Sequence, residues 1–113
     1  MVRVLPPNPH LQIQAVSRDE HLVVDVRGDL DLATGPLLEA ELHPLVQAES
    51  GDLVIDLRDL AFLDSAGATS LSRIAQDVAD RDGNLILRHP SRCVRRAIDL
   101  CCLGAVPGIE VSA

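Results

Sequence analysis

The tetrapeptide Asp64-Ser65-Ala66-Gly67 carries the residue types best suited to a chemical event in this sequence. Ser65 directly precedes a stretch with apolar residues at helical spacing, so we expect it at the amino end of a long helix. Backbone N–H groups are unpaired at such an end and the helix dipole adds positive charge, so a phosphate on Ser65 would be stabilised there. The small residues Ala66 and Gly67 would let another protein's active site approach closely. A plainer interpretation stays open, in which Asp64 or Ser65 is only the N-cap of the helix.

Other reactive residues form no complete catalytic or metal-binding pattern. Asp29 and Asp31 alternate on an extended segment without a third ligand nearby, so turn chemistry explains them better than a metal site. The four histidines lack metal-ligand spacing, and the three cysteines fit neither a disulfide framework nor a zinc site. A serine hydrolase is not expected, because Ser65 lacks the first glycine of Gly-x-Ser-x-Gly. We therefore predict a protein that is not an enzyme and uses no metal or cofactor.

Composition narrows the function further. The 113 residues are 47% hydrophobic and 24% charged, which is typical of one soluble globular domain. All ten basic residues are arginine against seventeen acidic ones, and the net charge of -7 argues against nucleic acid or an anionic membrane as partner. Without lysine, a P-loop and Schiff-base chemistry are excluded. With no apolar signal segment and no disulfide pattern, we expect a cytoplasmic protein without membrane insertion.

The elements that must position Ser65 describe an α/β domain. Residues 1–10 contain three prolines and are expected to form a flexible leader, and residues 11–113 a single domain. Strands are predicted at 11–17, 21–27, 53–57 and 85–87, with a short final strand at 109–111. The first predicted helix starts with Thr34 as N-cap and runs to about His43, with a kink at Pro44 or a short second piece through Ala48. Further helices are predicted at 65–80 and from Ser91 to Gly104.

Residues 58–63, which carry the only phenylalanine, are expected to form a loop. The element order is therefore β-β-α-β-α-β-α-(β). Strands that are separated by helices must run parallel, with right-handed crossovers. The prediction is a mixed sheet of four to five strands with packed helices.

Four segments of the chain resemble the STAS domain, and specifically the anti-sigma factor antagonists. They read GDLDLAT at 28–34, VIDLRDLAFLDSAGATSLSRI at 54–74, GNLIL at 83–87 and VRRAI at 94–98. Their order and spacing match the family, and the resemblance extends over about residues 11–111. It implies a STAS-like fold.

The resemblance also implies a partner switch. Anti-sigma factor antagonists bind a serine kinase that sequesters a sigma factor, and so release that sigma factor. Phosphorylation of one serine weakens the binding, and a phosphatase restores it. By position this serine is Ser65, and Ala66 stands where the family often has a second hydroxyl residue. The predicted partner-binding residues are Asp31, Thr34, Asp64, Ser65, Ala66 and Gly67, with Thr69, Ser72, Arg73 and Gln76 expected on the same side of the helix.

Two other functions stay open. The first is a STAS-fold binding module with another client, either in a signalling scaffold or as the cytoplasmic subunit of a lipid or anion transporter. The second is a small hydrolase or ligand-binding enzyme that would use Asp64 and Ser65. We expect the chain to be a monomer or a weak dimer.

Overall fold

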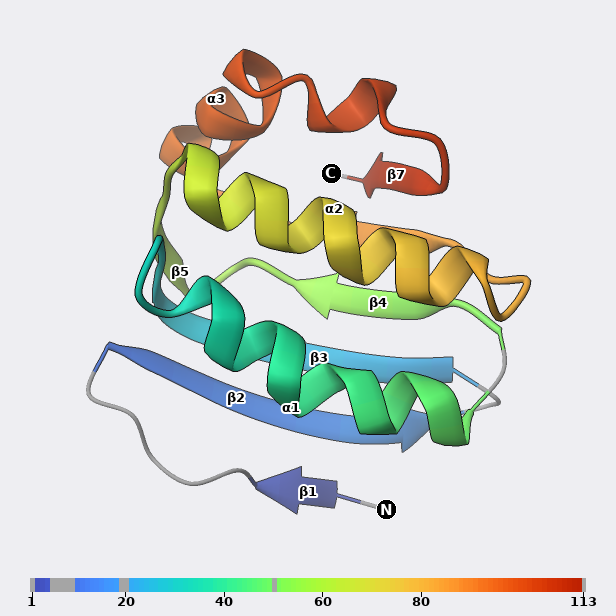
Figure 1. Ribbon diagram of the computed structural model, residues 1–113. Helices are drawn as coiled ribbons and strands as arrows, with labels where there is room; N and C mark the ends of the chain where they lie inside the picture. The colour runs from blue at the N-terminus through green and yellow to red at the C-terminus, as the bar shows by residue number, and fades with distance from the viewer. Residues whose placement is uncertain (1, 5–9, 19–20, 50, 113) are drawn as a thin grey trace.

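The computed structural model describes residues 2–4, 10–18, 21–49 and 51–112, and shows one mixed sheet with helices packed on it (Figure 1). Its strands are β1 (Val2–Val4), β2 (Leu11–Arg18), β3 (His21–Leu30), β4 (Leu53–Asp56), β5 (Leu60–Leu63), β6 (Leu85–Arg88) and β7 (Ile109–Ser112). The strand order is β1-β2-β3-β4-β6-β7, and β5 pairs with β3 beyond the end of β4. The first three strands are antiparallel neighbours, whereas β3, β4, β6 and β7 run parallel.

Within the described ranges, three α-helices connect the parallel strands. They are α1 (Gly35–Ala48), α2 (Ser65–Ala79) and α3 (Arg92–Leu100), and the short 3-10 helix η1 (Leu103–Ala105) follows α3. Figure 1 shows α1 and α2 side by side over one face of the sheet, with α3 beside the first turn of α2. The parallel strands require such crossovers, because a tight hairpin can join only antiparallel neighbours.

The core lies between the sheet and the inner faces of the helices. Val24, Ile55 and Leu87 stand in register on neighbouring strands, and each is fully buried. The helical side of the core contains Leu38, Leu42 and Val46 of α1 and Leu71, Ile74 and Val78 of α2. Full burial of one such side chain contributes about 1.5–3 kcal/mol, so this layer fixes the position of both helices.

The α/β class, the strands within 11–112 and the three helices agree with the sequence analysis, but the sheet is larger than expected. The prediction of a loop at 58–63 is wrong, because Leu60–Leu63 form β5. Val2–Val4 form β1 and pair with β2, so part of the expected leader belongs to the sheet. The three prolines of that leader lie outside the described residues. In the part of the chain that the structure describes, seven strands therefore replace the predicted four to five.

Two helix boundaries also differ from expectation. Pro44 lies inside α1 without ending it. Pro44 and Ala40 are both exposed, so the Ala40 carbonyl that loses its helical donor lies where solvent can reach it. Gly104 does not terminate α3: the helix ends at Leu100, Cys102 takes the left-handed conformation with φ 55°, and Gly104 belongs to η1.

Among the described helices, none has the length and apolar character needed to cross a membrane.

Candidate functional site

One corner of the molecule brings together two sequence segments, the end of β3 with the loop that follows it and the start of α2 at Asp64 and Ser65. Leu30 ends β3 and Leu63 ends β5, and the two residues are paired in register. The backbone N–H of Asp64 donates to the Leu30 carbonyl at 3.3 Å. A Cβ atom added at Gly67 would lie only 2.3 Å from the same carbonyl oxygen. Because residue 67 is glycine, the first turn of α2 can lie directly against the end of β3.

Asp64, and not Ser65, caps helix α2. One Asp64 carboxylate oxygen accepts a hydrogen bond from the Gly67 N–H at 2.8 Å, and the Asp64 carbonyl accepts one from Ala68 at 2.9 Å. Ser65 is the first residue of the helix and is exposed. Its hydroxyl makes no hydrogen bond to the described part of the chain, so it is free to react.

The loop between β3 and α1 forms the other wall of this corner. The Thr34 hydroxyl donates to the Asp29 carbonyl at 2.7 Å and accepts from the Asp31 N–H at 3.0 Å. An Asp31 carboxylate oxygen accepts from the N–H groups of Thr34 and Ala33. The Thr34 N–H is the main cause that holds the pKa of Asp31 below its ordinary value of 3.8. The loop therefore presents a fixed, ionised carboxylate.

Thr34 has a different structural task from the one predicted. It precedes α1 as expected, but its side chain makes no capping bond and is only 1% exposed. Its hydroxyl braces the loop instead. Thr34 therefore shapes the corner from inside, and its buried side chain is not available for direct contact.

The other predicted site residues differ in exposure. The exposed ones are Ser65, Thr69, Arg73 and Gln76. The half-buried ones are Asp31, Asp64, Ala66 and Ser72, and the buried ones are Gly67 and Thr34. The exposed members share one side of α2, as their spacing predicted. Whether they contact a partner stays a prediction.

Polar contacts also tie α2 to α1. The carboxylate of Glu39 accepts a hydrogen bond from the Ser70 hydroxyl at 2.9 Å and lies 3.6 Å from the Arg73 guanidinium. Farther along, His43 and Asp77 lie 2.7 Å apart through Nδ1 and Oδ2. Arg73 is thus exposed but already has an acidic neighbour, and Glu39 is a residue that the sequence analysis did not single out.

Large apolar side chains are exposed at the same end of the molecule. Among the described residues these are Leu32, Leu37, Phe62 and Leu100. The first three come from the loop after β3, the first turn of α1 and β5, which Figure 1 shows close to the start of α2. Exposed apolar side chains that gather in one patch are typical of protein interaction surfaces. None of these four was predicted as a site residue, because their exposure depends on tertiary packing.

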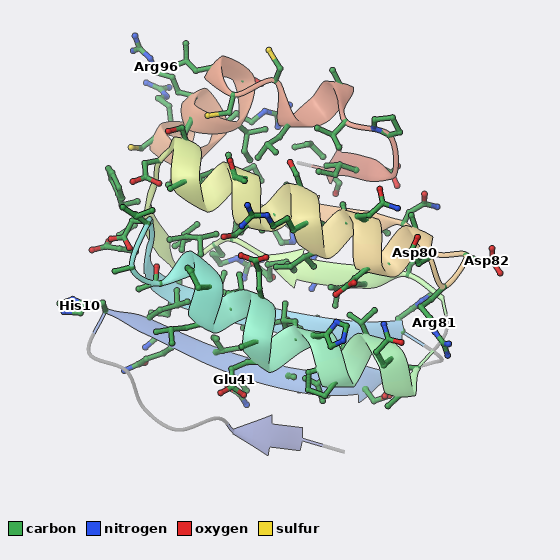
Figure 2. All side chains as sticks on the ribbon, in the orientation of Figure 1. His10, Glu41, Asp80, Arg81, Asp82 and Arg96 are labelled. Atoms are coloured by element: carbon green, nitrogen blue, oxygen red, sulfur yellow. The ribbon has the colours of Figure 1, made fainter. Side chains whose placement is uncertain are left out.

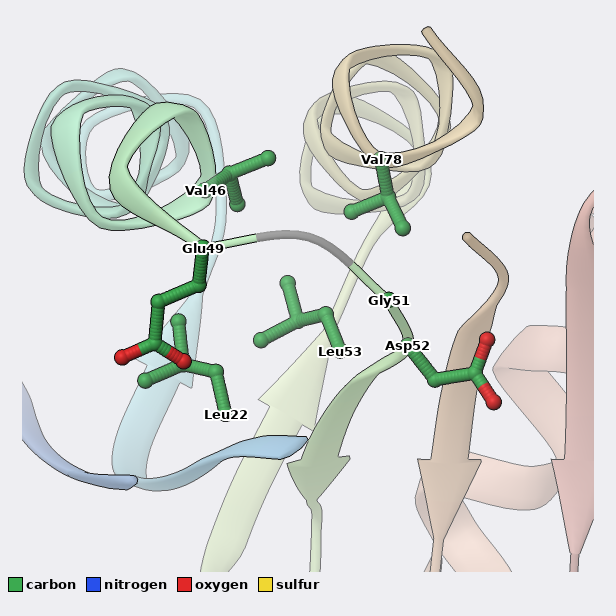
Figure 3. Close-up of a pocket in the computed structure, with 7 residues that line it drawn as sticks. All are labelled: Leu22, Val46, Glu49, Gly51, Asp52, Leu53 and Val78. Carbon is green, nitrogen blue, oxygen red and sulfur yellow. The ribbon is translucent and has the colours of Figure 1, made fainter. Parts of the chain in front are cut away.

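Two hollows differ greatly in size. The first, about 320 Å³, lies between α2 and the end of α3 and is lined by Ser65, Ala68, Thr69, Ser72, Leu100, Cys101 and Leu103. The second, at the other end of α1 and α2, has a volume of about 10 Å³. Figure 3 shows Val46 and Val78 facing each other across it, while the carboxylates of Glu49 and Asp52 point away to different sides. It has barely the volume of one water molecule, so of these two only the first hollow can receive a larger group.

The described residues contain no group of three or more histidine, cysteine, aspartate or glutamate side chains that is placed to hold a metal ion.

Comparisons with known proteins identify relatives over nearly the whole chain. The sequence profile of the STAS domain matches residues 12–112. The anti-sigma-B factor antagonist of Staphylococcus epidermidis is 29% identical over 91 residues, which are 80% of this chain and 84% of that protein. The anti-sigma-B factor antagonist of Bacillus subtilis is 26% identical over 104 residues, 92% of this chain and 93% of that protein.

Solved structures agree with the architecture. An anti-sigma factor antagonist from Mycobacterium paratuberculosis superposes with a TM-score of 0.75 at 26% identity, covering 94% of this chain and 90% of that one. Unphosphorylated SpoIIAA, also an anti-sigma factor antagonist, gives a TM-score of 0.73 at 21% identity, covering 89% and 88%. At this lower identity the likeness to SpoIIAA concerns the fold.

Proposed function

The chain belongs to the STAS domain family, and from that premise we propose that it is an anti-sigma factor antagonist. In this role it binds an anti-sigma factor serine kinase in the cytoplasm, and the kinase then releases its sigma factor. Phosphorylation of Ser65 ends the binding, and a serine phosphatase restores it. The chain acts by binding and catalyses no reaction itself, and it needs no cofactor.

The observation that carries this proposal is the state of Ser65. Its side chain is exposed at the start of α2 and its hydroxyl has no hydrogen-bond partner within the described residues. A kinase can therefore reach the hydroxyl without first breaking an internal bond. The names of the curated relatives support the antagonist role, and the exposed apolar side chains around Ser65 support a protein partner.

Electrostatics support the direction of the switch. A phosphate adds about -1.5 to -2 charges at neutral pH. The phosphate would stand beside the Asp64 carboxylate and near Asp31. The Asp64 N–H donates to the Leu30 carbonyl, and Asp31 is the residue that follows Leu30. The chain already has a net charge of -7. A partner that fits the unphosphorylated corner would meet a concentrated negative charge that is costly to desolvate, so binding weakens.

The test compares wild type with Ser65→Ala and Ser65→Asp as baits in a lysate of the source organism. We expect wild type and Ser65→Ala to retain a soluble ATP-binding kinase, which mass spectrometry identifies, and Ser65→Asp to lose it. With the purified kinase, the dissociation constant of Ser65→Asp should rise at least tenfold, which corresponds to about 1.4 kcal/mol. Equal affinity of all three chains would disprove the switch.

Phosphorylation itself is measured separately. After incubation with the retained kinase and ATP, peptide mapping should find phosphate on Ser65 of the wild type. The Ser65→Ala chain keeps Thr69 and Ser70 nearby and serves as the control. Equal phosphate incorporation into this variant would place the modification elsewhere.

A further inference from the structure

The hollow between α2 and the end of α3 begins at Ser65 itself. Ser65, Thr69 and Ser72 line it from α2, Leu100, Cys101 and Leu103 line the other side, and the hollow is open to solvent. Its volume of about 320 Å³ reaches the lower range of pockets that hold a ligand. One large side chain of another protein fits such a space.

The walls of the hollow combine hydroxyl and apolar groups, and two of the three hydroxyls are already bonded inside α2. The Thr69 hydroxyl donates to the Ser65 carbonyl at 3.0 Å, and the Ser72 hydroxyl donates to the Ala68 carbonyl at 3.2 Å. Both hydroxyl protons are therefore used within α2. Among the described residues no charged side chain lines the hollow, and Leu100 is 75% exposed on its rim. An apolar side chain would cover Leu100 without leaving a charge unpaired.

Helix α3 continues this surface with positive charge. Arg92, Arg96 and Leu100 follow one another at four-residue intervals, so they lie along one side of the helix. All three are exposed, and neither arginine makes an ion pair with any described residue. Figure 2 shows Arg96 projecting away from the molecule at the end where α2 begins, whereas Arg81 lies at the opposite end of α2.

We infer that the protein partner inserts one large apolar side chain into this hollow and presents carboxylates beside it that pair with Arg92 and Arg96. The inference rests on the proposed function, and it specifies the chemistry of the partner's docking segment. It also links docking to Ser65: because Ser65 lines the hollow, a phosphate there would place a strong charge beside an apolar side chain that must lose its water.

The charge part is tested with two matched substitutions, Arg96→Glu and Arg81→Glu. Both are at exposed arginines and change the net charge equally. The probe is the purified kinase that the wild-type chain retains. We expect at least a tenfold rise in the dissociation constant for Arg96→Glu and less than a twofold rise for Arg81→Glu. Equal effects would mean only long-range repulsion and would overturn the pairing with α3.

The apolar part is tested at Leu100 and Cys101. Leu100→Ala should weaken binding at least fivefold, whereas Leu100→Met, which keeps an apolar side chain, should bind within twofold of wild type. In a Cys93→Ser, Cys102→Ser chain, Cys101 is the only thiol and reports on the hollow. Bound kinase should slow alkylation of Cys101 by iodoacetamide at least tenfold. Unchanged alkylation, or equal binding by both Leu100 variants, would show that the hollow stays empty.

The outcomes separate the two proposals. If Ser65→Asp weakens binding but the Arg96 and Leu100 variants bind as wild type does, the antagonist role stands and the docking inference is wrong. If no kinase is retained, the antagonist role is wrong and the inference fails with it. If Ser65→Asp binds as wild type does, the switch is wrong, and the Arg96 and Leu100 variants alone decide the docking inference. Melting temperatures of the variants within about two degrees of wild type exclude misfolding as the cause of lost binding.

Discussion

Replacing Gly67 by alanine tests how closely α2 lies against β3 at the corner that presents Ser65. The new Cβ would lie 2.3 Å from the Leu30 carbonyl oxygen and 2.9 Å from Cδ1 of Leu63. Real Cβ contacts are almost never shorter than 3.0 Å, so helix and strand must separate by about 0.7 Å. Such overpacking costs about 1–3 kcal/mol, whereas alanine gains up to about 1 kcal/mol of helix propensity. We expect a net loss of about 1–2 kcal/mol in the free energy of unfolding.

The assay is urea unfolding followed by circular dichroism, with Gly104→Ala as the matched control. A Cβ atom at residue 104 would meet no described atom within 4 Å, and Gly104 does not have a positive φ, so alanine there should leave stability unchanged or raise it by about 0.4–1 kcal/mol. A loss of 1 kcal/mol lowers the melting temperature by roughly 4–8 °C in a domain near this size. If Gly67→Ala is as stable as wild type, the close approach of α2 to the end of β3 is refuted.

Substitutions at three further residues test the hydrogen bonds of the same corner. Asp64→Ala removes the cap on the Gly67 N–H and should cost about 1 kcal/mol of unfolding free energy in urea, while Asp64→Asn should retain most of it. Thr34→Val leaves the Asp29 carbonyl and the Asp31 N–H without their hydroxyl partner and should cost about 1–3 kcal/mol by the same assay, whereas Thr34→Ser should cost less. The pKa of folded Asp31 is below its unfolded value, so its contribution to stability is present above pH 3.8 and is lost as the pH falls through the folded pKa. The urea midpoint of Asp31→Asn should therefore lie below that of wild type at neutral pH and converge with it in acid, and a constant difference would contradict this assignment.

Local patterns predicted most elements of the fold but not β5. Apolar runs and helical spacing were sufficient for the parallel strands and for α2, because these elements bury one continuous face. In β5 only the two end residues, Leu60 and Leu63, are buried, so no alternation marks it as a strand. It exists because it pairs with β3 after a register shift between Gly28 and Asp29. Such a pairing depends on residues about thirty positions away, and a local pattern does not contain it.

The sequence likewise predicted only part of the candidate site. The start of α2 at Ser65 and the exposed side with Thr69, Arg73 and Gln76 followed from helical spacing. The burial of Thr34 did not, because its hydroxyl is enclosed only when the loop after β3 closes. The hollow was likewise missed, since it forms where η1 and the end of α3 meet α2.

Because Asp64 caps α2, the stability of this helix does not depend on the Ser65 hydroxyl that the proposed switch would phosphorylate. If the Ser65 hydroxyl capped α2, phosphorylation would remove the cap. Part of the effect of phosphorylation would then be a destabilised helix. With Asp64 bonded to the Gly67 N–H, the hydroxyl of Ser65 contributes nothing to the fold that a phosphate could take away. The N–H groups of Ser65 and Ala66 and the helix dipole would still favour the added anion within the chain. In the proposed switch, the unfavourable part of the change therefore acts at the interface with the partner, and the helix that carries Ser65 stays in place.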